Sequence, residues 1–222
     1  MTWNRLRFKK IRILLAWIGC AALFLNAKTN DSSFRIGVPI VIGGELIRIW
    51  ALGYLEQKGK VLATNGPFSY VRNPLYIGNF FIGLGVTIIS YQWLFLVLFL
   101  IGFFVIYQGV VQNEEKELAT RFGGSYVDYR KKVGAFLPRW APFSGRGRTR
   151  FELKRLWKHH EHITVIGIAL LVAALYLWEE IILQGDFKWK EKIAIGFIMA
   201  LLTVIIYELA AKTRRSLTAV MI

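Results

Sequence analysis

The sequence predicts an all-α, polytopic integral membrane protein with about six transmembrane helices and amphipathic helices on the cytoplasmic side. Of its 222 residues, 55% are hydrophobic, and the mean hydropathy of +0.43 exceeds that of an ordinary soluble domain. The apolar residues come in blocks near the length that crosses about 30 Å of hydrocarbon. The basic residues gather in alternate connecting segments, as they do in membrane proteins with a fixed orientation.

Six apolar blocks are candidate spans. They cover residues 11–27, 36–55, 75–90, 93–111, 163–183 and 193–211. The third is short, and the fifth ends with Glu179 and Glu180. The first also resembles a signal peptide, because a basic front precedes an apolar run and an A-x-A-like end. We expect it to be retained, since the odd number of remaining spans would fit the charge distribution less well.

The charge of +15, from 29 Lys and Arg against 14 Asp and Glu, could suggest nucleic-acid binding, but its distribution argues against that. The segments on one side hold five basic residues in 1–12, three in 54–74, twelve in 112–162 and three in 211–222, whereas the other side holds two in 26–36 and three in 184–192. The positive-inside rule therefore places both termini and the long basic loops in the cytoplasm. We expect the protein to reside in the cell or inner membrane, with the lipid bilayer as its partner. No nucleic acid or obligate protein partner is evident.

The chain divides into three predicted parts. Residues 1–141 form a core, 142–162 a basic hinge with an interfacial helix over 151–162, and 163–222 a C-terminal transmembrane hairpin with a basic tail. A helical stripe, interrupted by Gly123 and Gly124, predicts either one amphipathic helix or two short ones. Its members are Leu118, Phe122, Tyr126, Tyr129 and Val133.

The stretch 66–85, "GPFSYVRNPLYIGNFFIGLG", contains the first candidate site residues. Pro74 pushes Asn73 toward an extended conformation and suits the first position of a helix. The free N–H groups of that helix end, with Arg72 beside them, predict an anion site. The glycines that follow permit either close helix packing or the close approach of a ligand.

Two adjacent carboxylates, Glu114 and Glu115, follow the fourth apolar block, at the expected level of Arg72. Neighbouring residues on a helix point about 100° apart, so one can face the bundle while the other faces water. Carboxylates are unfavourable near a helix C-terminus. We therefore expect a cationic partner for them, either Arg72 or a ligand.

Together these segments resemble the isoprenylcysteine carboxyl methyltransferase family and the related phospholipid N-methyltransferases. The family pattern G-P-[YF]-x-x-x-R-[HN]-P-x-Y-x-G, then E-E-x-x-L and F-G-x-x-Y-x-x-Y, is matched over roughly residues 45–140. The matching residues are Gly66, Pro67, Arg72, Pro74, Tyr76, Gly78, Glu114, Glu115, Leu118, Phe122, Gly123, Tyr126 and Tyr129. Asn73 stands where the eukaryotic prenylcysteine enzymes resemble one another in having His.

The resemblance implies a helical membrane methyltransferase that binds S-adenosyl-L-methionine at the cytoplasmic side and methylates a lipophilic acceptor. It implies catalytic roles for Arg72, Tyr76 and Glu115. The implied cofactor-binding residues are Arg72, Asn73, Pro74, Tyr76, Gly78, Gly83, Gly85, Glu114 and Glu115.

We expect Arg48, Tyr126 and Tyr129 to bind the acceptor, although Arg48 could instead form a structural ion pair with Glu45 inside the second span. The histidines of "HHEH" at 159–162 fit a solvated face better than a metal site. The single Cys20 excludes an intramolecular disulfide and a cysteine-based metal cluster.

A prenylcysteine-type carboxylate is the favoured acceptor, because it is ionised at neutral pH, whereas an amine must first lose a proton. A phospholipid amine and a small thiol remain alternatives. From other classes, a transporter would use Glu45 and Arg48 as its polar pathway. A steroid-reductase-like enzyme would need Arg121 or Arg130 for the NADPH phosphate.

Overall fold

The computed structural model describes residues 19, 22–23, 25–56, 61–144 and 149–183, and within these ranges all regular structure is helical. The chain divides into two compact units, residues 1–161 and 162–222. The predicted three-part division, with boundaries at 141 and 162, stays a prediction. The predicted site residues all belong to the first unit.

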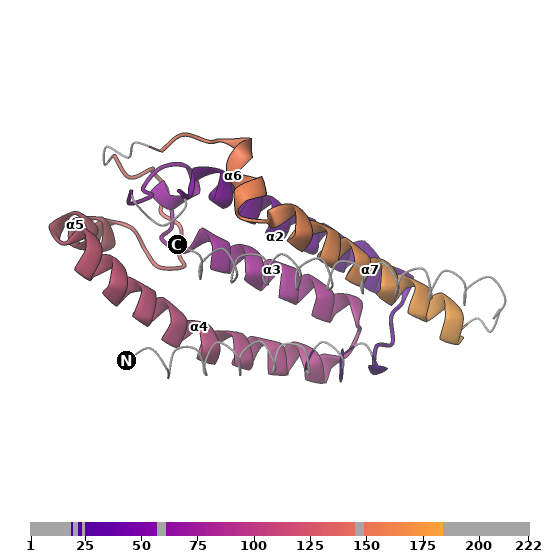
Figure 1. The fold of residues 1–222 in the computed structure, drawn as a ribbon. Helices are drawn as coiled ribbons and strands as arrows, with labels where there is room; N and C mark the ends of the chain where they lie inside the picture. The colour runs from indigo at the N-terminus through magenta and orange to yellow at the C-terminus, as the bar shows by residue number, and fades with distance from the viewer. Residues whose placement is uncertain (1–18, 20–21, 24, 57–60, 145–148, 184–222) are drawn as a thin grey trace, which may run out of the picture. The chain divides into compact units, whose positions relative to one another are not determined.

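The first unit is built on three long helices: α2 (Asp31–Tyr54), α3 (Pro74–Ile89) and α4 (Trp93–Phe122). Helix α3 packs along α2 and also contacts α4 (Figure 1). Three short helices complete the description of this unit, namely the 3-10 helix η2 (Gly66–Ser69), α5 (Gly124–Lys132) and α6 (Leu153–Lys158). Helix α7 (Glu161–Leu183) starts at the end of the first unit and runs on in the second.

Two of the described helices, α2 and α4, are long and apolar enough to cross a membrane, while α3 and residues 161–177 of α7 are shorter apolar helices. At 1.5 Å per residue, the 16 residues of α3 give a length of about 24 Å. The four middle predicted spans thus correspond to helices. The first span lies largely, and the sixth wholly, outside the described residues, so the structure does not test a total of six.

Glycines set the contact between α2 and α3. A Cβ on Gly44 would lie 2.7 Å from the carbonyl oxygen of Gly78, and a Cβ on Gly78 would lie 2.7 Å from that of Gly44. Gly37 and Gly85 form a second pair, again with each hypothetical Cβ 2.7 Å from the other's carbonyl oxygen. Because nothing but hydrogen fits at these positions, the two backbones can approach closely.

These contacts correct one expectation from the sequence. Gly78, Gly83 and Gly85 were expected to clear space for a cofactor, but neighbouring helices fill that space: α2 at Gly78 and Gly85, and the Phe99 ring of α4 at Gly83. The glycines therefore serve helix packing. The sequence pattern left both explanations open, since packing depends on which helix lies opposite.

Helix α4 continues beyond its apolar block to Phe122. The glutamate pair consequently lies about two turns inside the helix, rather than at its end as expected. Helix α4 ends before Gly123, whose φ of 54° suits glycine, and α5 begins at Gly124. The predicted stripe is thus divided between two helices, but its first part belongs to the long α4 rather than to a separate short helix. The helix expected over 151–162 is also shorter than predicted, since α6 covers only Leu153–Lys158. The positive φ of His160, 59°, separates it from α7.

Candidate active site

The segment between α2 and α3 carries the Arg-x-Pro-x-Tyr motif and is held by the segment that follows α5. Three of the contacts are backbone hydrogen bonds: the N–H groups of Phe143 and Arg139 donate to the carbonyls of Ser69 and Tyr70, and that of Arg72 donates to Gly134. The side chain of Asn73 adds a bond to the carbonyl of Ala135 at 3.1 Å. Pro74 is the first residue of α3, as predicted.

The Arg72 side chain points to α4 and pairs with Glu115. Its Nη1 lies 2.7 Å from Oε1 of Glu115, and both side chains are 11% exposed. From α5, Nε of Arg130 lies 3.2 Å from the other carboxylate oxygen, although the Arg130 side chain is 57% exposed. The buried carboxylate of Glu115 thus has the cationic partner that the sequence predicted.

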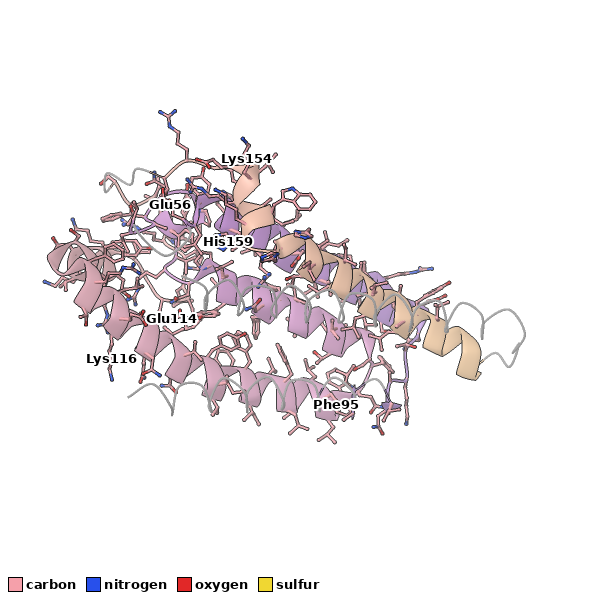
Figure 2. All side chains as sticks on the ribbon, in the orientation of Figure 1. Glu56, Phe95, Glu114, Lys116, Lys154 and His159 are labelled. Atoms are coloured by element: carbon pink, nitrogen blue, oxygen red, sulfur yellow. The ribbon has the colours of Figure 1, made fainter. Side chains whose placement is uncertain are left out.

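The side chain of Glu114 points in a different direction from that of Glu115. Its side chain lies on the α3 side of α4, whereas Lys116 points away (Figure 2). The hydroxyl of Tyr76 donates a hydrogen bond to Oε1 of Glu114 at 2.5 Å, and Glu114 is exposed while Glu115 is buried. The two adjacent carboxylates therefore have different environments, as their 100° separation predicted.

An apolar cavity of about 720 Å³ adjoins this cluster. Tyr76 and Pro74 contribute to its wall, together with α2, α4 and the Phe136–Pro138 segment. Its other lining residues are almost all apolar or aromatic: Ile47, Trp50, Pro67, Tyr70, Val71, Ile77, Phe80, Phe81, Phe103 and Phe104. The cavity is within the size range of small-molecule sites, and Tyr76 joins it to the charged residues.

Tyr126 and Tyr129 are 1% and 3% exposed and form a core cluster with Val133. Burial raises the pKa of Tyr126, and nearby Glu115 adds to the increase, while Arg72 opposes it. Burial also raises the pKa of Tyr129 far above its usual value. Both side chains are therefore neutral, and the Tyr129 hydroxyl donates to the motif segment at Phe68. Their expected role in binding the acceptor stays a prediction.

Replacing Tyr129 with phenylalanine should lower the free energy of unfolding by about 1–3 kcal/mol, because a buried carbonyl would lose its partner. The Tyr129 hydroxyl donates to the carbonyl of Phe68 at 2.6 Å. Thermal unfolding in detergent measures the effect. The control is Tyr91→Phe, which removes the hydroxyl of a 56%-exposed side chain. Equal melting temperatures for the two variants would contradict the prediction.

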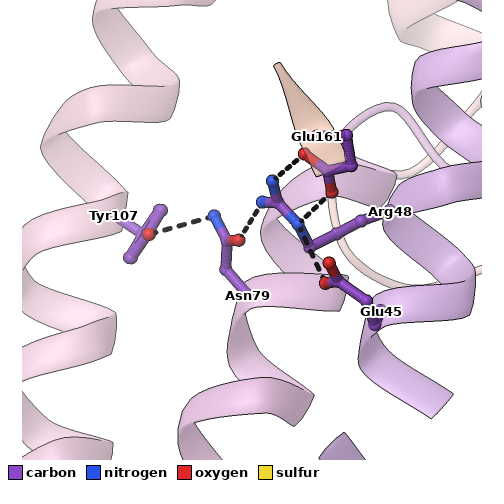
Figure 3. Close-up of polar contacts among 5 residues, drawn as sticks. All are labelled: Glu45, Arg48, Asn79, Tyr107 and Glu161. Atoms are coloured by element: carbon purple, nitrogen blue, oxygen red, sulfur yellow. Dashed lines mark hydrogen bonds and ion pairs between the residues drawn. The ribbon is translucent and has the colours of Figure 1, made fainter. Parts of the chain in front are cut away.

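Arg48 belongs to a polar network inside the helical bundle (Figure 3). Its Nε and Nη2 donate to the two carboxylate oxygens of Glu161 at 2.8 and 2.7 Å. Glu45 lies 3.4 Å away, and Nη1 donates to Oδ1 of Asn79. The guanidinium is thus paired mainly with Glu161 rather than only with Glu45, the partner considered from the sequence. Binding of the acceptor by Arg48 stays a prediction.

Sequence reasoning missed the bond from Asn79 to Tyr107, the partnership of Glu161 with Arg48 and the contact of Arg130 with Glu115. Polar residues in otherwise apolar blocks are a usable signal for the first of these. The Arg48–Glu161 pair joins residues 113 positions apart, which no local pattern reveals. The described residues contain no group of His, Cys, Asp or Glu arranged to hold a metal ion.

The comparison with known families gives a direct match to this region. Residues 32–125, which include α2, the motif segment, α3 and the glutamate pair, match the family model described as phospholipid methyltransferase. This segment is therefore similar to the phospholipid methyltransferase family. The resemblance inferred from the motifs is thereby confirmed.

Individual relatives of the segment carry several names. The chain is 35% identical over 83 residues to a protein-S-isoprenylcysteine O-methyltransferase of Schizosaccharomyces pombe, which covers 37% of this chain and 35% of the relative. Proteins of the same name from other organisms match at about 30% identity. These relatives are methyltransferases by name, and the match spans only about a third of the S. pombe protein.

Two further relatives have different names. The cobalt-zinc-cadmium resistance protein CzcN of Cupriavidus metallidurans is 24% identical over 147 residues, which cover 65% of this chain and 66% of that protein. The steroid 5-alpha-reductase DET2 of Solanum lycopersicum is 32% identical over 109 residues, covering 47% and 42%. No solved structure matches the chain.

Proposed function

We propose that the protein is an integral membrane methyltransferase that uses S-adenosyl-L-methionine and methylates a lipophilic acceptor, specifically a prenylcysteine-type carboxylate. The observation that carries the proposal is the junction between the apolar cavity of about 720 Å³ and the cluster of Arg72, Tyr76, Glu114 and Glu115. The cavity offers room for an isoprenoid or acyl chain. The cluster offers charges of both signs at the polar end.

The residues present fit the proposed cofactor, which supplies an electrophilic methyl group on a sulfonium. Nε of Arg72 is buried and has no hydrogen-bond partner among the described residues, so the guanidinium can still receive a carboxylate. Glu114 is exposed and can pair with an ammonium. Arg72, Glu114 and Glu115 would thus hold the amino-acid end of the cofactor, and Tyr76 would position Glu114.

The chain's contribution to the reaction is chiefly positioning. A carboxylate acceptor is already ionised at neutral pH, so no group need remove a proton from it. What the displacement requires is alignment of donor and acceptor in a site protected from water. The aromatic side chains around the cavity exclude water. The segment 134–143 holds the motif loop, which leads into α3, through the hydrogen bonds described above.

We place this site and both termini in the cytoplasm, and the protein in the cell or inner membrane. The support is the charge distribution, because the basic segments 54–74 and 112–162 contain the Arg72 motif and the glutamate pair. The partners would then be the bilayer, as solvent for the helices, and an acceptor that enters from it.

A phospholipid amine is the second candidate acceptor, and the phospholipid methyltransferase match over residues 32–125 favours it. An ammonium must lose a proton before it can attack. The exposed carboxylate of Glu114, already a hydrogen-bond acceptor for Tyr76, could take that proton. A small-thiol acceptor has no specific support from the cavity, which suits a long apolar chain.

The test is a methyl-transfer assay on the purified protein with methyl-labelled cofactor. Label should enter N-acetyl-S-farnesylcysteine but not phosphatidylethanolamine vesicles. Glu114→Gln should reduce turnover at least tenfold, because it removes the charge that faces α3, while Lys116→Gln on the opposite side of α4 should not. Label in the phospholipid alone would show that the acceptor is an amine rather than a carboxylate. Label in neither compound would count against both proposed acceptors.

A further inference from the structure

The donors and acceptors of the Arg48 network constrain the hydroxyl of Tyr107. An arginine side chain only donates hydrogen bonds, so the oxygen of the Asn79 amide must face Arg48. The amide nitrogen then faces α4 and donates to the Tyr107 oxygen at 3.2 Å (Figure 3). Because that oxygen is the acceptor in this bond, the Tyr107 hydroxyl proton remains available for another partner.

No acceptor for this proton is found among the described residues. Tyr107 precedes Glu114 by seven residues on α4, which places it about 10 Å along the axis toward the apolar half of the helix. A polar group in such surroundings is costly unless it is hydrogen-bonded. The arrangement therefore favours a ligand atom as the partner.

Tyr107 lies beside the proposed acceptor path. Its ring packs edge-on against Tyr76, with centroids 4.8 Å apart, and stacks on Phe103 at 4.1 Å. Both neighbours line the apolar cavity, and Tyr76 also contacts Glu114. The Tyr107 hydroxyl is thus adjacent to the wall where the apolar cavity meets the polar cluster.

We propose that the Tyr107 hydroxyl donates a hydrogen bond to an oxygen of the methyl acceptor and so selects acceptors that carry oxygen at the reacting end over those that carry an ammonium. This inference rests on the proposed methyltransferase function. The buried Arg48–Glu161 pair orients the donor through Asn79. A hydrogen-bond donor held in one orientation discriminates strongly between ligands, because a ligand that has no hydrogen-bond acceptor at that point leaves the donor unpaired.

The experiment compares the binding of two probes that share one apolar chain. N-acetyl-S-farnesylcysteine carries a carboxylate, and S-farnesylcysteamine carries an ammonium instead. Titrations are made on the full chain with S-adenosylhomocysteine present. Tyr107→Phe keeps the ring contacts and should weaken the carboxylate probe about tenfold or more, with less than a twofold change for the amine probe. Tyr91→Phe, which lies just beyond the C-terminal end of α3, should change neither.

Equal weakening of both probes would mean that Tyr107 is only a packing residue, and would overturn the inference. Unchanged binding of the carboxylate probe, or no binding of it by the wild type, would overturn it as well. A separate titration with S-adenosylhomocysteine alone distinguishes failure of the Tyr107 contact from failure of the methyltransferase function. Normal binding leaves the methyltransferase function standing, whereas failure of the wild type to bind removes the basis of both.

A second variant tests the orienting role of Asn79. Asn79→Leu removes the bond to the Tyr107 oxygen, so part of the selectivity for the carboxylate probe should be lost. If both residues act through one hydroxyl, the double variant Asn79→Leu/Tyr107→Phe should lose no more than Tyr107→Phe alone. Additive losses would contradict the proposed coupling.

Discussion

Replacing Arg72 with alanine should lower the affinity for S-adenosylhomocysteine at least tenfold. Hydrogen bonds to charged groups contribute about 1.5–3 kcal/mol, and Arg72 is the buried cation that can meet a ligand carboxylate at this site. Arg72→Lys should be intermediate, because it keeps the charge but loses the planar fork. Titration calorimetry on detergent-purified protein measures both variants. The exposed residue Lys131 provides the control Lys131→Ala.

The Arg72→Ala variant should also be less stable, by about 1–3 kcal/mol, because Glu115 would keep only the exposed Arg130 as its cationic partner. The double variant Arg72→Gln/Glu115→Gln separates the two effects. It removes both charges, so it should recover most of the stability without recovering binding. Wild-type affinity in a folded double variant would mean that the Arg72–Glu115 pair is structural only.

Replacing Gly44 with alanine should destabilise the protein by about 1–3 kcal/mol, because the added methyl group would meet backbone atoms that cannot move aside. Its Cβ would lie 2.7 Å from the Gly78 carbonyl oxygen and 2.8 Å from the Ile82 nitrogen. The neighbouring Gly43 has no atom within 4 Å of its hypothetical Cβ. Gly43→Ala is therefore a matched control, and should be neutral or stabilising, since alanine favours a helix.

The two glycine variants can be compared by thermal unfolding, followed through the intrinsic fluorescence of the eight tryptophans. Gly44→Ala should also weaken ligand binding, because a displaced α3 carries Tyr76 with it. If Gly44→Ala melted at or above the temperature of Gly43→Ala, the close packing of α2 on α3 would be refuted.

The local features of the site were predictable because single residues determine them. Pro74 fixes the start of α3, Gly123 breaks the helix before α5, and the 100° step separates Glu114 from Glu115. The break at Gly123 and the pairing of Arg72 with Glu115 were each one of two stated options. In each case the governing physics acts within a few residues of the chain.

The remaining features depend on which helix lies opposite. A run of small residues can leave space for a ligand or for a neighbouring helix. Here Gly44 faces Gly78 and Gly37 faces Gly85, so the space is filled by helix packing. Tyr126 and Tyr129 of α5 match a functional motif, yet both are buried in a core cluster with Val133, which the local pattern did not predict.

We expect the Arg72 cluster to bind the sulfur-containing methyl donor rather than NADPH, the cofactor of the steroid-reductase-like alternative considered from the sequence. The most direct measurement is a calorimetric titration of the purified, folded protein with S-adenosylhomocysteine and, separately, with NADPH. The account predicts saturable one-site binding of S-adenosylhomocysteine that is lost in Arg72→Ala, and no binding of NADPH. Binding of NADPH alone, or of neither compound, would contradict it.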